Sequence, residues 1–133
     1  MAVAKRGTLL IVSGPRHDPL RKHLHVVCSD PDDDGRTVIV AICSLTEPHH
    51  DQTCVLAKGD HEFIVQESYV FYAKAKITTV KALEAGIEQK VMEQYEDLRL
   101  HSFLKVAAGI CRSPHTPRGV KKFMNCVEPT VEI

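Results

Sequence analysis

The sequence Thr37-Val-Ile-Val-Ala-Ile-Cys43 carries the strongest strand signal of the chain. Apolar and β-branched residues fill it without the polar and apolar alternation that marks a half-exposed strand. A run of this kind is typical of a strand that is covered on both faces. The turn-forming cluster Ser-Asp-Pro-Asp-Asp-Asp-Gly, residues 29–35, stands just before it. We therefore expect residues 37–43 to form a central strand of a sheet.

Shorter strand signals lie on both sides of this run. Thr8–Val12 is apolar and is bounded by Gly7 before it and by Ser13-Gly14-Pro15 after it. Further extended segments are predicted over Leu24–Cys28, Cys54–Leu56 and residues 68–80.

The apolar pattern changes to a helical period in the last third of the chain. Apolar residues recur at helical spacing between Leu100 and Cys111, which predicts a helix that begins near Lys90 and ends before Pro114. Thr116-Pro117 is typical of a helix start and predicts a short helix through Phe123. Strands followed by helices favour an α+β fold, mainly β, or a small barrel with a covering helix. The expected parts are a barrel over about 7–80, a helix over about 90–112, and a short helix and tail over 116–133.

The composition is that of one globular domain spanning residues 1–133. Hydrophobic residues make up 44% and charged residues 26%, which is ordinary for such a domain. Lys plus Arg and Asp plus Glu both number 17, so no overall field attracts nucleic acid or a membrane, and any polyanion site must be local. The apolar runs are too short to span a bilayer, and no signal-type stretch follows the first residues. We expect a cytoplasmic protein without a membrane partner.

Five cysteines, at positions 28, 43, 54, 111 and 126, form an odd set without a C-x-x-C pair. Cys28 and Cys43 lie inside apolar runs, where free cysteine behaves as a small hydrophobic residue. The sequence therefore predicts reduced thiols and no disulfide framework.

The first three predicted strands and their connections carry a family resemblance. Gly7-Thr-Leu-Leu-Ile-Val12, a polar loop, His25-Val-Val-Cys-Ser-Asp30, a turn and Arg36-Thr-Val-Ile-Val-Ala-Ile-Cys-Ser44 follow in order. Phe63–Val70 and Ala75–Val80 add two later segments. This arrangement, over most of residues 7–111, resembles the PemK/MazF family of toxin endoribonucleases. The resemblance implies a small SH3-like barrel of the PemK/MazF/CcdB-like type with a C-terminal helix. It also implies a homodimer that cleaves single-stranded RNA without a metal or other cofactor and is neutralised by a cognate antitoxin protein.

Two positions of that family matter most for its activity: an arginine that closes the first loop, and a threonine or serine that ends the third strand. The second position matches Ser44, whereas the first falls at His23, directly after Arg21 and Lys22. Either Arg21 or Lys22 supplies the cation, or His23 replaces it chemically, or the chain does not cleave RNA. Metal-free RNA cleavage needs a base, an acid and a cation for the phosphate, and histidine and arginine suit these tasks.

Further side chains are candidates for contact with RNA: Arg16, His17, Lys58, Tyr72, Lys74 and Lys76. In a regular strand Tyr72, Lys74 and Lys76 share one face, and aromatic rings on such a face can stack on bases. Phe71 is expected in the core. The alternative for the loop from Gly14 to His23 is a solvated surface whose charges only confer solubility.

Two other functions stay open. A non-catalytic PemK-like barrel that binds protein or nucleic acid accounts for the histidine at position 23 and for the zero net charge. A metal site would first involve His49, His50 and His61, but their spacing matches no standard zinc pattern, so a polar loop is favoured and no metal is predicted. His25 is expected to be half-buried and hydrogen-bonded rather than catalytic.

Overall fold

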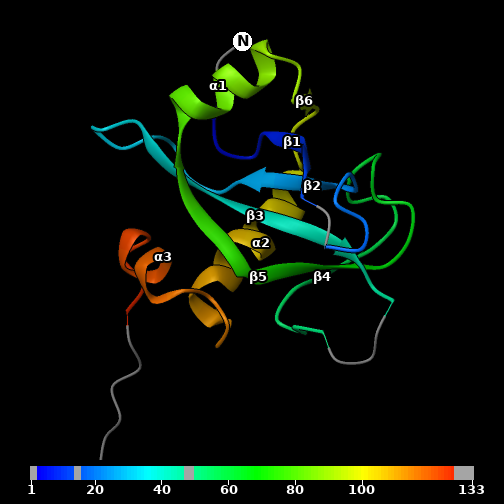
Figure 1. The fold of residues 1–133 in the computed structure, drawn as a ribbon. Helices are drawn as coiled ribbons and strands as arrows, with labels where there is room; N and C mark the ends of the chain where they lie inside the picture. Colours follow the sequence, from blue (N-terminus) through cyan, green and yellow to red (C-terminus); the bar gives the residue numbers. More distant parts are fainter. Residues whose placement is uncertain (1–2, 14–15, 47–49, 128–133) are drawn as a thin grey trace, which may run out of the picture.

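The computed structural model describes residues 3–13, 16–46 and 50–127. Within them six strands form one antiparallel, half-barrel sheet in the order β4-β5-β3-β2-β1-β6, accompanied by three helices (Figure 1). The elements are β1 (Thr8–Val12), β2 (Lys22–Val27), β3 (Arg36–Ser44), β4 (Val55–Leu56), β5 (Ser68–Thr79), α1 (Val80–Glu88), β6 (Met92–Tyr95), α2 (Leu100–Arg112) and α3 (Arg118–Phe123). The mixed, mainly β composition agrees with the fold class predicted from the sequence.

Strand β3 is the central strand that its composition predicts. It lies between β2 and β5, and its residues 37–42 are buried. The predicted turn before it is present, because Gly35 adopts a positive φ of 75° and its N–H donates to the carbonyl of Asp32. A positive φ is cheap only for glycine, so this residue fixes the turn.

One face of the sheet is fully covered by helices. Buried side chains of β2, β3 and β5 pack with α2 and α3 in the larger core cluster, and Figure 1 shows α2 running behind the sheet. Tyr72 is fully buried there, and its hydroxyl donates to the Val106 carbonyl at 2.7 Å. A Cβ on Gly109 would lie only 1.9 Å from the Tyr72 hydroxyl oxygen. The glycine therefore allows the helix to approach the strand.

The other face of the sheet is only partly covered. Helix α1 packs Leu83 against Leu9, Val27 and Ile39, which together with Val3 form the smaller core cluster. In Figure 1 this helix continues from the end of β5 and lies above β1, at the top of the view. The remainder of the face, over the other ends of β2, β3 and β5, has no helix above it among the described residues.

The prediction of a helix from Lys90 was wrong over its first ten residues. Residues 92–95 form β6, which pairs with β1, and α2 begins only at Leu100. An isolated β1 edge would leave backbone groups unpaired, and this tertiary pairing outweighs local helix propensity. Helix α1 was not predicted, although Thr79 caps it by accepting a hydrogen bond from the Ala82 N–H. The short helix predicted through Phe123 is confirmed as α3, and the tail beyond residue 127 lies outside the described residues.

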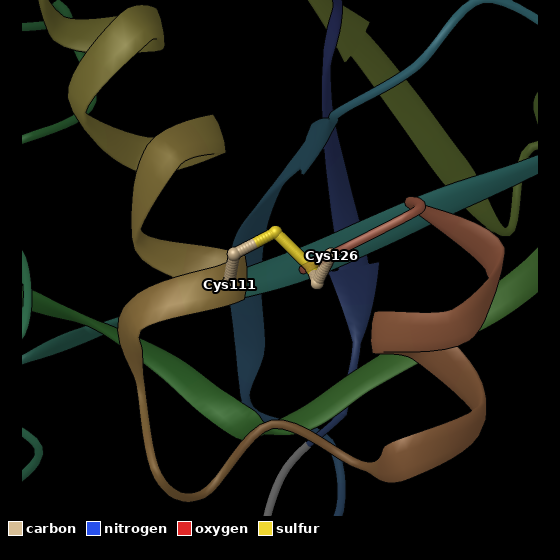
Figure 2. The surroundings of a disulfide bond; sticks show 2 residues. All are labelled: Cys111 and Cys126. Atoms are coloured by element: carbon tan, nitrogen blue, oxygen red, sulfur yellow. A yellow bond between two sulfur atoms is a disulfide. The ribbon is translucent and has the colours of Figure 1, made fainter. Parts of the chain in front are cut away.

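The prediction that the cysteines are all reduced was also wrong. Cys111, near the end of α2, forms a disulfide with Cys126, just after α3, with an S–S distance of 1.98 Å (Figure 2). The chain reverses through α3 and brings the two residues together, and no sequence spacing reveals such a reversal. Cys28, Cys43 and Cys54 are free thiols. No helix of the described chain is both long and apolar enough to cross a membrane.

Candidate functional site

A cavity of about 870 Å³ occupies the part of the sheet that α1 leaves open. Its floor is β3, where Ala41 and Cys43 point into it, and β2 and β5 form its two sides. Burial raises the pKa of the Cys43 thiol, and this effect exceeds the opposite effects of a hydrogen bond with Tyr69 and of the nearby Arg21. The floor is therefore uncharged at neutral pH.

Strand register sets larger side chains on each side of this low floor. Ala41 pairs with His25 on one side and with Phe71 on the other, and Cys43 pairs with Tyr69. His23 is two residues from His25 and therefore points to the same face. The cavity exists because small residues on the central strand lie between bulky residues on its neighbours.

The cavity brings together six of the residues predicted from the sequence. They are His17, Arg21, His23, Ser44, Lys74 and Lys76. His25 and His50 also line it, and none of its described lining residues is acidic. A chain with equal numbers of positive and negative side chains thus concentrates positive charge at one place, as a local polyanion site requires.

His23 lies at the start of β2, directly after the loop that joins β1 to β2, and it pairs with Ile11. The Ser13 N–H donates to the Arg21 carbonyl at 2.9 Å, and the Ser13 hydroxyl lies 2.9 Å from His23 Nδ1. Partial burial and then the charge of Arg21 lower the pKa of His23. The imidazole is therefore neutral at pH 7 and able to accept a proton.

His25 lies deeper in the cavity and is 8% exposed. Its Nδ1 is 2.9 Å from the His23 carbonyl, which can only accept, so this nitrogen carries the hydrogen. Burial, together with the nearby His23 and Lys76, lowers the pKa of His25 to about 4, although that hydrogen bond by itself raises it. His25 is hydrogen-bonded as expected, but it is buried rather than half-buried.

Ser44 ends β3 and is half-buried at the cavity wall, where its backbone position pairs with Ser68 of β5. Ser44 therefore lines the same cavity as Arg21 and His23, although it lies more than 20 residues away from them along the chain.

Three predicted cations lie outside the cavity. Lys22 alternates with His23 on β2 and faces the other way, where its Nζ is 3.2 Å from the Glu93 carboxylate. Arg16 is exposed in the loop after β1, and Lys58 is exposed in the turn after β4. Neither is a lining residue.

The prediction that Tyr72 contacts RNA was wrong, because its side chain is in the core. The expectation of Phe71 in the core was also wrong, because its half-buried side chain lines the cavity. Ile39 pairs with Lys76 and Ala41 with Phe71, so residues 72–75 of β5 bulge opposite Val40 alone. The irregularity separates Tyr72, on the covered face, from Lys74 and Lys76, on the open face.

The sequence allows Tyr69 and Phe71 to stack on bases, but the core was favoured for Phe71 and neither was predicted as a site residue, whereas both line the cavity. The signal that could have found them is the strand period, since they alternate with the buried Val70 and Tyr72. That signal does not say which of the two faces is open.

The proposed metal ligands do not assemble among the described residues. His61 is buried, and its Nε2 lies 3.1 Å from the Thr8 hydroxyl and 2.9 Å from the Glu96 carbonyl. It therefore ties the loop before β5 to the edge of the sheet. His50 lies beside Tyr69, and His49 is outside the described residues. No group of three potential ligands occurs in the described ranges.

Comparisons with protein-family models, with curated proteins and with solved structures find no match for this chain.

Proposed function

We propose that the cavity binds single-stranded RNA and that its own side chains cleave the RNA backbone. The observation that carries this proposal is the meeting of Arg21, His23 and Ser44 at one cavity whose described lining contains no acidic residue. The resemblance to the PemK/MazF family singles out two positions, which fall at Ser44 and His23, and Arg21 is one of the candidates for the cation of that family.

Each side chain has a distinct task in the proposed reaction. Neutral His23 takes the proton from the ribose 2′-hydroxyl, and the Ser13 hydroxyl keeps the ring oriented. The 2′-oxygen bonds to the adjacent phosphorus while the bond from phosphorus to the 5′-oxygen breaks. His17, at the same cavity, supplies the proton to the leaving oxygen. The products carry a 2′,3′-cyclic phosphate and a 5′-hydroxyl.

The phosphate needs a cation and a hydrogen-bond donor as its charge grows. Arg21 is in the cavity and remains charged at all relevant pH values. Lys22 is engaged with Glu93 on the opposite side of β2. We therefore assign the role of the family's arginine to Arg21 and not to Lys22, with Ser44 as the donor to a phosphoryl oxygen.

The test is incubation of the purified protein with long single-stranded RNA in the presence of a chelator. Wild type should cleave, and His23→Ala should slow cleavage by about 10²- to 10⁴-fold because it removes the base. Arg21→Ala should cost about 10²-fold. Lys22→Ala and Arg16→Ala are the matched controls, since each removes a neighbouring cation that does not line the cavity. Absence of cleavage by the wild type overturns the catalytic proposal.

The second candidate is a non-catalytic barrel that binds nucleic acid or protein. It is favoured by the histidine at the position of the family's arginine. RNA binding without cleavage, retained in His23→Ala, would establish this candidate in place of the enzyme.

The remaining proposals rest on the family resemblance. They are closure of the half-barrel sheet as an SH3-like barrel, a homodimer, a cytoplasmic location and an antitoxin partner. The cavity suits an acidic antitoxin segment. Apart from one thiol and one tyrosine, the charged or titratable groups of its described lining are all cations and histidines. Loss of RNA cleavage on addition of such a segment would support this pairing.

A further inference from the structure

We infer that Tyr69 and Phe71 form a stacking subsite for an unpaired nucleobase, beside the proposed phosphate site. This inference rests on the proposed function and adds the part of the substrate that the cavity recognises.

The two rings form one aromatic surface on the side of β5. Tyr69 and Phe71 are two residues apart on the strand, their ring centroids are 5.9 Å apart, and both line the cavity. His50 extends the surface, since its ring centroid is 5.3 Å from that of Tyr69. The ring planes of Tyr69 and Phe71 are tilted by 57°, so each ring offers a face of its own, and an aromatic face can bind any base through the π-face of that base.

The need for a hydrophobic core does not account for these rings. The core on β5 is supplied by Val70 and Tyr72, which alternate with them and are fully buried. Tyr69 and Phe71 are half-buried on the opposite face and belong to neither core cluster.

The rings lie at a suitable place relative to the proposed reacting groups. His25 and Phe71 are both paired with Ala41, so they are separated by two strand spacings, roughly 10 Å. A phosphate near Arg21 and His23 therefore leaves its nucleotide room to lay a base over the small side chains of the floor and against the aromatic side.

Positive charge continues along β5 beyond the rings. Lys74, within the bulge, and Lys76, directly after it, line the same cavity. Single-stranded RNA exposes both its base faces and its phosphates, so rings followed by cations on one β-strand can contact both. A duplex would hide the base faces.

The test is binding of fluorescent oligonucleotides that carry 2′-O-methyl groups and therefore lack the attacking hydroxyl. A single strand with bases is compared with an abasic strand of the same phosphate number. Wild type should bind the base-bearing strand about tenfold more tightly. Tyr69→Leu combined with Phe71→Leu should abolish this preference and leave binding of the abasic strand unchanged.

Two controls isolate stacking from folding and from hydrogen bonding. Tyr69→Phe keeps the ring and should keep the preference. Phe63→Leu removes a ring that is 42% exposed, contacts Tyr95 and does not line the cavity, and it should have no effect. Thermal melting of each variant verifies that it is folded.

The outcomes separate this inference from the proposed function. Equal binding of both strands by wild type, or a preference that survives the double leucine variant, overturns the stacking subsite alone. Base-dependent binding with no cleavage of ordinary RNA supports the subsite and overturns catalysis. Binding of neither strand overturns both.

Discussion

The two faces of the sheet are built by the same strands but have opposite character. On β2, β3 and β5, one set of alternating residues is apolar and packs against α2 and α3. The other set includes two histidines, a thiol and two aromatic rings, and it borders a cavity. Each strand thus contributes both to stability and to the candidate site, through neighbouring residues.

The difference between the faces comes from which helices cover them. Helix α2 is 13 residues long and lies across one face, whereas α1 has 9 residues and covers only one end of the other. An uncovered end of a face can hold polar and titratable groups without the full cost of burying them. Substitutions of adjacent residues should therefore have very different effects on the two faces.

The largest expected contrast is between Tyr72 and Phe71. Tyr72→Ala should lower the free energy of unfolding by about 3–5 kcal/mol, because it leaves a cavity in the core and removes the hydrogen bond to Val106. Phe71→Ala removes a half-buried ring that already borders a cavity, and we expect a loss of about 1 kcal/mol. Urea unfolding of both variants measures the contrast. Similar losses would show that the two faces are equally important for stability.

The second prediction concerns the disulfide that holds α3 against the covered face. Cys111→Ser combined with Cys126→Ser should lower the free energy of unfolding by about 3 kcal/mol, as expected for a closed loop of this size. Thermal melting with and without a reductant measures the effect in the wild type. The control is Cys28→Ala, which removes a free, buried thiol. The change in its melting temperature on adding reductant should equal that of the wild type. If reductant leaves the wild-type melting temperature unchanged, the disulfide does not stabilise the fold.

The third prediction tests the close approach of α2 to β5. Gly109→Ala should lower the free energy of unfolding by about 2 kcal/mol, because the new Cβ collides with the Tyr72 hydroxyl. Gly119→Ala in α3 is the matched control, since nothing lies within 4 Å of its Cβ position and alanine favours a helix. Chemical denaturation of both variants should give changes of opposite sign. A stabilised Gly109→Ala variant would contradict the packing of Tyr72 under α2.

Much of the sheet could be predicted because its strands are coded locally. The apolar run of β3, the glycine and proline boundaries of β1 and the turn at Gly35 are all visible in the sequence. The wrong predictions depend on long-range contacts. Residues 92–95 become a strand because β1 offers them a free edge, and Cys111 meets Cys126 only after α3 reverses the chain.

The candidate site was predicted in part for the same reason. Arg21 and His23 are close in sequence, at the end of a loop and the start of β2, and the strand-end position of Ser44 follows from the length of β3. The roles of Tyr72 and Phe71 were exchanged because a bulge in β5 shifts the register, and no residue pattern reveals it. Lys22 could be distinguished from Arg21 as a site residue once its ion pair with Glu93 on β6 was known.

The smallest expected effect is the pH dependence that His25 gives to the open face. Burial holds its folded pKa at about 4, below the value of about 6.5 in an unfolded chain. Folding therefore favours the neutral ring, and the contribution is present above pH 6.5 and is lost as the pH falls toward 4. Between pH 6 and pH 5 the loss should be about 1 kcal/mol. His25→Asn removes this titration, while the carboxylates titrate alike in both proteins. The difference in unfolding free energy between wild type and His25→Asn should therefore shrink by that amount over this range. A constant difference would mean that the ring is as accessible to protons when folded as when unfolded, and that the β2 side of the cavity is open to water.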